Sequence, residues 1–279
     1  MADQPNVVFS ISTDLEFRGR QLKAIKPDAN GVYKGIPLTV IGINSRNNVC
    51  YDKNSVIDCL TNENSRFVMN LRSGDLEGEW GHPLLDPDPK KMLSRLLYLD
   101  RTKVSHHFTK VYAKDTGNGS LIVYGDVKPS GPYGKDLKAN FEDATRNASF
   151  SLRAATIPTK TENNVIYKRM LAMFTFDAVD GPGYVEASKR FQDPSFESLG
   201  ITTPNEGCVD VSASRDDFLS ATEALQATGL ESKIVDQCVL DAFGCDEVVV
   251  KEKVLKKVRD GFVDSSGSKV SIFDQAFGF

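Results

Sequence analysis

Three side chains that together can activate a hydroxyl group lie far apart in this chain: a histidine, a serine and an aspartate. His82 stands between Gly81 and Pro83 in the stretch EGEWGHP and is one of only three histidines in 279 residues. A serine hydroxyl is a weak nucleophile that needs a base such as histidine within hydrogen-bonding distance. The flanking glycine and proline restrict this histidine, so it would lose little entropy when acting as a base. The alternative is a loop histidine with only a structural or capping role.

The candidate nucleophile is Ser151, in the alternating segment ASFSLRAAT. Strict alternation predicts a β-strand, and it puts Ser149, Ser151 and Arg153 on one face of that strand. The alternative is that the two serines merely cover the solvent-exposed face of an edge strand.

The candidate third member is Asp177, which follows the apolar run MLAMFTF and precedes the turn residues DGPG. A carboxylate at a strand end can accept a hydrogen bond from histidine Nδ1–H, which fixes the tautomer and stabilises the imidazolium. An aspartate before glycine and proline can also simply form a turn. The other histidines, His106 and His107, point to opposite faces of a predicted strand. One of them could orient His82, or both could be ordinary strand residues.

The elements expected around these residues are mainly strands. Periodicity and turn residues predict a strand at 31–43, helices at about 53–62, from Pro89 and at 135–146, a hairpin at 104–113 and 121–127, and a strand pair within 165–179. From about residue 190 the composition changes. We expect a strand-rich domain over 1–190, a linker over 191–212 and a small helical tail over 213–279, in which Ser214 and Asp217 form a capping box.

Composition and charge exclude several classes of function. The chain is 40% hydrophobic and 26% charged, enough for a sizeable core, and its net charge of −4 gives no general attraction to nucleic acid. No apolar run reaches the length of a membrane span, and the first residues lack the pattern of a signal peptide. The five cysteines form no CxxC pair and the histidines lack metal-binding spacing, so we expect no disulfide framework, metal or cofactor.

In their order along the chain, these motifs resemble those of the prohead core proteases of tailed phages, a family of capsid-maturation serine proteases. The segment SRNNVCYDKNSVIDCL is similar to the family's NRN-x-x-x-Y segment and helix. Residues Gly78–Pro83 are similar to its GEL-x-HP motif, FSLRA to VSSRG, and Asp177–Pro182 to DAV-x-GP. Trp80, Leu152 and Ala154 depart from the family pattern.

The resemblance implies a fold and a set of roles. The fold is α+β and herpesvirus-protease-like: an antiparallel β-barrel core with surrounding helices, here followed by the small helical C-terminal tail. In these terms residues 1–190 form the serine protease domain. His82 is the general base, Ser151 the nucleophile, with Ser149 as a minor rival, and Asp177 the acidic member. Arg153 contributes to the oxyanion or substrate site.

The resemblance also implies a function: a viral prohead endopeptidase that cleaves scaffold and major capsid precursor proteins during head maturation. It would act as a homo-oligomer in the prohead core, inside the bacterial host cytoplasm, without nucleic acid or membrane partners. Related proteases cleave after glutamate, with a small or aliphatic residue two positions earlier. Glu197, Glu223 and Glu231 end such triplets and are possible self-cleavage sites, and Glu197 lies in the expected linker. The alternative is a non-enzymatic core or scaffold protein that keeps the protease fold.

Overall fold

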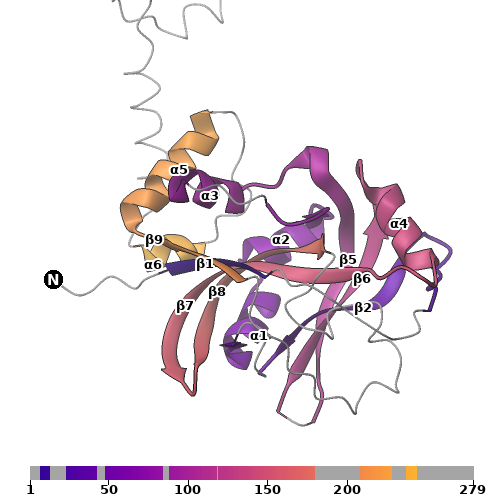
Figure 1. Cartoon of the computed structure of the whole chain (residues 1–279), viewed down its shortest axis with the longest axis horizontal. Coiled ribbons are helices and arrows are strands. Elements are labelled where there is room, and N and C mark those ends of the chain that lie inside the picture. The colour runs from indigo at the N-terminus through magenta and orange to yellow at the C-terminus, as the bar shows by residue number, and fades with distance from the viewer. Residues whose placement is uncertain are drawn as a thin grey trace, which may run out of the picture.

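A computed structural model of the chain describes residues 7–12, 23–42, 48–83, 88–117, 119–179, 208–227 and 237–243. In these residues the strands form two sheets, with helices packed around them (Figure 1). Among the same residues, no helix combines the length and the apolar character that crossing a bilayer requires.

The larger sheet has five strands in the order β3-β8-β7-β1-β9. Its strands are β1 (Val7–Ser12), β3 (Val49–Tyr51), β7 (Ser149–Glu162), β8 (Val165–Val179) and β9 (Cys208–Ala213). At its centre β7 and β8 form a long antiparallel hairpin. The turn consists of Asn163 and Asn164, both with positive φ, as a two-residue hairpin turn requires. The expected strand pair at 165–179 is therefore one strand of 15 residues.

The smaller sheet has four strands in the order β2-β6-β5-β4. They are β2 (Tyr33–Ile41), β4 (Glu77–Glu79), β5 (Val104–Asp115) and β6 (Leu121–Pro129), so the expected strand and hairpin are confirmed. The closed barrel implied by the resemblance is not formed by the described strands. Edge strand β4 is only three residues long, and just beyond it a single isolated bridge, from Trp80 to Ala178, reaches the larger sheet. A continuous ladder would be needed to close a barrel.

The described residues form six helices, and side chains cap the N-termini of some of them. They are α1 (Lys53–Thr61), α2 (Arg66–Ser73), α3 (Pro89–Leu96), α4 (Gly134–Glu142), α5 (Arg215–Ala227) and α6 (Gln237–Ala242), with a 3-10 turn at Arg101–Lys103. Asp52 and Ser65 cap α1 and α2 by accepting hydrogen bonds from backbone N–H groups three residues later. α4 ends before the expected residue 146, because the Asp143 side chain accepts the Thr145 N–H and forms a turn.

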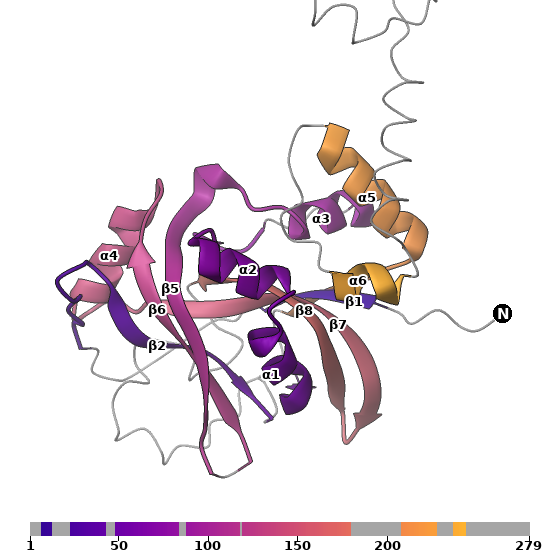
Figure 2. The same ribbon diagram turned by 180° about the vertical axis from the view of Figure 1, so that it is seen from behind.

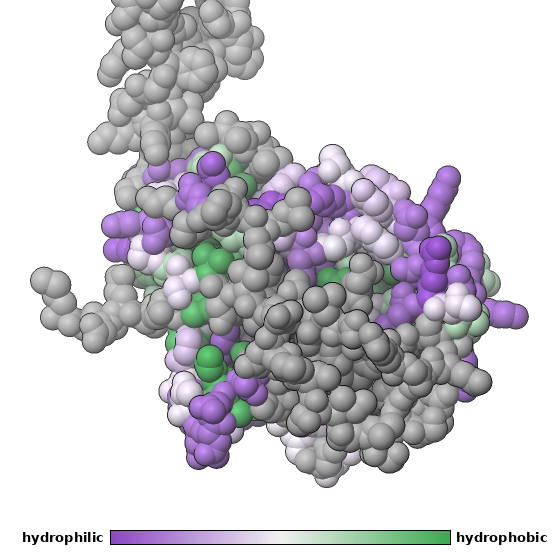
Figure 3. Space-filling model, in the orientation of Figure 1, coloured by the Kyte–Doolittle hydropathy of each residue, from purple (hydrophilic) through white to green (hydrophobic). Residues whose placement is uncertain are grey.

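Two hydrophobic cores hold these elements together. The first lies between the two sheets and includes an aromatic cluster of Phe108, Phe150 and Phe176. α1 and α2 lie on the side of the molecule that faces the viewer in Figure 2, and both helices contact β8. The second core packs α3, α5 and α6 against the larger sheet, through residues such as Leu93 and Phe218. In the described part of the face seen in Figure 3, hydrophilic residues predominate and hydrophobic ones form small separate areas.

The described part of the C-terminal region packs onto the rest of the chain. β9 pairs along its whole length with β1, and α5 contacts α3. The capping box is confirmed: the Ser214 hydroxyl accepts the Asp217 N–H at 3.2 Å, and the Asp217 carboxylate accepts the Ser214 N–H at 3.3 Å. The division into domain, linker and tail stays a prediction. Most of the expected linker, and the expected tail beyond residue 243, lie outside the described residues.

The two sheets are in close contact at Gly78 of β4. Next to it, buried His106 contacts the Phe176 carbonyl through Nε2 at 3.0 Å, and Ser105 Oγ through Nδ1 at 2.8 Å. Burial lowers the pKa of His106 to about 4, so the ring is neutral at neutral pH. A Cβ atom on Gly78 would lie 2.2 Å from the Phe176 carbonyl oxygen and 2.4 Å from His106 Cε1. Only glycine fits at this contact.

The substitution Gly78→Ala should therefore lower the free energy of unfolding by about 2–3 kcal/mol, because the new methyl group forces the sheets apart. Gly117→Ala is the control. Gly117 has a φ of +80°, but a Cβ atom added there would meet nothing within 4 Å, so only about 1 kcal/mol of backbone strain is expected. Urea unfolding of both variants measures the difference. Equal destabilisation by the two substitutions would contradict the close contact at Gly78.

Candidate active site

Ser151 and Asp177 face each other across the central hairpin. They are directly paired in the β7–β8 ladder, so their side chains lie on the same face of the sheet. Residues paired in this way have Cβ atoms about 4.5–5.5 Å apart. Both are buried, with 3% of Ser151 and 0% of Asp177 exposed. The alternative of serines on the exposed face of an edge strand is wrong, because β7 is an inner strand and Ser149 is buried as well.

His82 reaches Asp177 because the chain after β4 crosses to the larger sheet. The Gly81 N–H donates to the Ala178 carbonyl at 2.7 Å, next to the bridge formed by Trp80. Gly81 has a φ of +77°, a left-handed conformation that favours glycine. The turn brings His82 Nδ1 to 3.2 Å from Asp177 Oδ2, and only 5% of the His82 side chain is exposed.

Asp177 thus contacts His82 through its carboxylate and is paired with Ser151 in the β7–β8 ladder. When Nδ1–H of His82 donates to Asp177, Nε2 is the ring nitrogen that can accept a proton. This tautomer follows from the hydrogen-bond partner, since carboxylate oxygens only accept. The arrangement can therefore deprotonate a hydroxyl group by general base catalysis.

Arg153 is fully buried and makes a bidentate ion pair with Asp177. Its Nε lies 3.1 Å from Oδ2, and its Nη2 lies 2.9 Å from Oδ1 and 2.8 Å from Oδ2. Nη2 is also 3.1 Å from a Glu79 oxygen, and Nη1 donates to the Tyr98 carbonyl at 2.9 Å. These contacts involve all three guanidinium nitrogens, and they hold the Asp177 carboxylate in place. The oxyanion or substrate role that the resemblance implies for Arg153 stays a prediction.

Two charged residues that the sequence did not single out complete this network. The Glu79 carboxylate is buried and accepts hydrogen bonds from Arg95 at 3.0 Å and from the Asp100 N–H at 2.9 Å. The Glu79 N–H donates to Asp177 Oδ1 at 3.1 Å. The buried cluster therefore holds two carboxylates and two guanidinium groups, and its charges balance. The sequence signal for Glu79 was its place in the motif at Gly78–Pro83, three residues before His82.

The environment keeps Asp177 ionised. Burial by itself would raise its pKa, but the charge of Arg153 and hydrogen bonds from His82 and Arg153 outweigh burial and lower the pKa below the ordinary value. The cost of burying the carboxylate is offset by this paired charge. An ionised Asp177 is what a histidine base requires to stabilise its protonated form.

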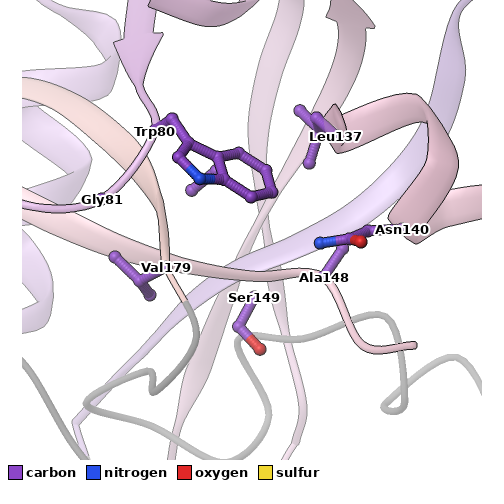
Figure 4. A pocket seen from close by; sticks show the side chains of 8 residues that line it. Trp80, Gly81, Leu137, Asn140, Ala148, Ser149 and Val179 are labelled. Atoms are coloured by element: carbon purple, nitrogen blue, oxygen red, sulfur yellow. The ribbon is translucent and has the colours of Figure 1, made fainter. Parts of the chain in front are cut away.

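A small pocket opens beside this site (Figure 4). Its lining consists of Trp80, Gly81, Leu137, Asn140, Ala148, Ser149, Ala178 and Val179, none of them charged. Ser149 and Val179 are paired in the hairpin two residues along from Ser151 and Asp177, a distance of about 7 Å along a strand. Asn147 Nδ2 donates to the Ser149 hydroxyl at 2.8 Å. Ser149 is therefore paired with Val179 and contacts Asn147, whereas Ser151 is paired with Asp177.

The remaining sequence-predicted residues are placed less centrally. His106 contacts Ser105 and Phe176, and His107 Nδ1 lies 3.1 Å from the Ser130 hydroxyl. Glu223 lies within α5. Glu197 and Glu231 lie outside the described residues.

Comparison with known proteins identifies relatives of this chain. Residues 13–239 match the model of the Peptidase S80 family. A capsid maturation protease of Pseudomonas phage phiKZ is 25% identical over 211 residues, which span 70% of this chain and 75% of the phage protein. The structure of the bacteriophage T4 capsid assembly protease aligns with 64% of this chain and 100% of its own, with 15% identity and a TM-score of 0.42.

The family match covers most of the chain, including every residue of the candidate site. The chain therefore belongs to the Peptidase S80 family, and the membership among phage prohead proteases that its motifs predict is confirmed.

Proposed function

We propose that this protease is a serine endopeptidase with Ser151 as nucleophile, His82 as general base and Asp177 as the carboxylate that orients the base. The observation that supports the proposal most strongly is the buried Asp177 carboxylate, which contacts His82 Nδ1 at 3.2 Å and is paired across the hairpin with Ser151. Membership of a peptidase family supplies the reaction class.

In the proposed reaction, Ser151 Oγ attacks the carbonyl carbon of a peptide bond while His82 Nε2 takes its proton. Asp177 stabilises the imidazolium and stays ionised, because Arg153 pairs with it. His82 then gives the proton to the leaving amine nitrogen as the C–N bond breaks, which leaves an acyl-enzyme. A water molecule, deprotonated by His82, then attacks the acyl carbon. The bond between that carbon and Ser151 Oγ breaks, His82 returns the proton to Oγ, and the carboxylate product leaves.

The biological setting proposed here is the interior of a phage prohead in the bacterial host. The similarity to a capsid maturation protease of phage phiKZ supports scaffold and capsid precursor proteins as substrates. Action as a homo-oligomer in the prohead core, and the herpesvirus-protease-like character of the fold, remain predictions from the motif resemblance.

Cleavage after glutamate, with a small or aliphatic residue two positions earlier, is the proposed specificity. The uncharged pocket suits the small or aliphatic side chain two positions before the cut, because Leu137, Ala148 and Val179 offer an apolar lining. The spacing agrees: the pocket lies about two strand residues from Ser151, and an extended substrate places every second side chain on the same face. A glutamate side chain would find no cation there, so we assign its recognition to a different part of the cleft.

Replacing Ser151 tests the nucleophile. Ser151→Ala should reduce cleavage of a scaffold protein by at least about a thousandfold, because no other hydroxyl is paired with Asp177 among the described residues. Mass spectrometry of the fragments measures the loss, and Ser220→Ala, on the exposed side of α5, is the matched control. Ser149→Ala should still cleave. Undiminished activity of Ser151→Ala would reject the assignment, and an inactive wild-type chain would favour the non-enzymatic scaffold protein.

Changing the size of the pocket tests its role in specificity. Val179→Phe should shift preference from leucine towards glycine or alanine two positions before the cut, because the larger ring fills the pocket. Val179→Ala should shift it the other way, each by roughly tenfold in the ratio of kcat/KM values. Competition between two peptides that differ only at that position measures the ratio. If both variants keep the wild-type preference, the pocket holds some other part of the substrate.

Self-cleavage is proposed at Glu197 rather than at Glu223. Glu223 lies within helix α5, so a cut there requires local unfolding before the backbone can enter a protease cleft. On incubation the wild-type chain should lose mass by a cut after Glu197, Glu197→Gln should prevent that cut, and Glu223→Gln should leave it unchanged. Intact-mass spectrometry follows the reaction. A wild-type chain that keeps its full mass while it cleaves a scaffold protein would contradict self-processing.

A further inference from the structure

The buried Glu79–Arg95 pair lies outside the reacting groups but is joined to them through one side chain, Arg153. We infer that Glu79 and Arg95 are positioning residues that set the electrostatic balance at His82, and that the two act in opposite directions. The inference rests on the proposed function, in which His82 is the base.

A series of contacts connects helix α3 to His82, the candidate base. Arg95 of α3 donates to both carboxylate oxygens of Glu79, with 3.0 Å between Nη1 and Oε1. Oε1 of Glu79 also lies 3.1 Å from Arg153 Nη2. Arg153 in turn donates to both oxygens of Asp177, which contacts His82. Glu79 also reaches Asp177 directly, through its backbone N–H.

The charges in this series of contacts should affect the protonation of His82, which packing alone would not do. Glu79, Asp177 and Arg153 are fully buried and Arg95 is 19% exposed, so solvent screens their charges weakly. Neutralising Glu79 leaves one extra positive charge, which disfavours a protonated imidazole nearby. Neutralising Arg95 leaves one extra negative charge, which favours it. Both changes break the same ion pair, so a purely structural role predicts effects in one direction only.

Other titratable groups around the cluster do not carry this effect. His106 of β5 lies near Asp177, but burial lowers its pKa to about 4 and the ring stays neutral in the neutral range. Tyr98 follows α3, and burial raises its pKa, so its hydroxyl also stays neutral. Asp100 stays ionised: burial would raise its pKa, but hydrogen bonds from Thr102 outweigh burial and lower it.

The fold around Arg95 does not depend on its ion pair. The apolar side of α3 is buried in the second core, where Leu93 and Leu96 pack with Phe218 of α5. Arg95 also donates to the Tyr98 carbonyl at 3.0 Å, and its guanidinium carbon lies 5.2 Å from the centre of the Tyr98 ring. We therefore expect variants at Glu79 and Arg95 to keep the position of α3.

The test compares kcat/KM against pH for wild type, Glu79→Gln, Arg95→Met and the double variant, with one peptide substrate. The acidic limb of such a profile reports protonation of the base in the free enzyme. It should move to lower pH in Glu79→Gln and to higher pH in Arg95→Met, each by roughly half to one pH unit. The double variant restores neutrality and should return the limb close to the wild-type position.

A second readout needs no activity. In a Ser151→Ala background, the His82 ring can be titrated by NMR, since the chain holds only three histidines. The titration midpoint should shift in the same opposite directions. Equal shifts in one direction, or no shift in either variant, would overturn the inference even if activity falls. A wild-type chain that cleaves nothing would refute the proposed function, while the NMR titration would still decide the charge coupling.

Discussion

The structure of this site depends on keeping one buried carboxylate ionised. Asp177 is withdrawn from water between two sheets, where an unpaired charge would cost several kcal/mol. Arg153 compensates it with two parallel hydrogen bonds, a geometry that guanidinium and carboxylate groups share. This pair holds the carboxylate in one orientation and keeps it ionised. The position from which it contacts His82 is therefore fixed. The orientation of His82, the proposed base, therefore follows from a charge that the fold cannot leave unpaired.

The two sheets contribute unequally to this arrangement. The β7–β8 hairpin supplies Ser151 and Asp177 from one pair of its ladder and Arg153 from two residues further along β7, so their relative positions are set by strand geometry. The smaller sheet supplies His82 from the segment that follows its short edge strand β4. This segment crosses to the larger sheet, where Trp80 and Gly81 pair with Ala178 of β8. The contact of His106 with the carbonyl of Phe176, the residue before Asp177, stabilises this junction. The turn at Gly81 therefore decides whether His82 reaches Asp177.

Much of this arrangement could be predicted from the sequence, because it follows from local pattern. Alternation in ASFSLRAAT placed Ser151 and Arg153 on one face, and the strand before DGPG placed Asp177 near its end. Contacts between distant segments could not be predicted. Nothing in the spacing showed that Arg153 would pair with Asp177, or that Arg95 of α3 would contact Glu79. The barrel expectation failed for the same reason: strand pattern does not show which edges pair, and β4 is too short to close one.

The central claim is that Asp177, held by Arg153, orients His82 so that Ser151 becomes a nucleophile. A fluorophosphonate reagent tests it most directly, because it bonds covalently to an activated serine and the modified peptide can be identified by mass spectrometry. The account predicts labelling at Ser151 in the wild-type chain, and a rate of labelling lower by about a thousandfold or more in Asp177→Asn. Labelling at another serine, or an equal rate in Asp177→Asn, would contradict it.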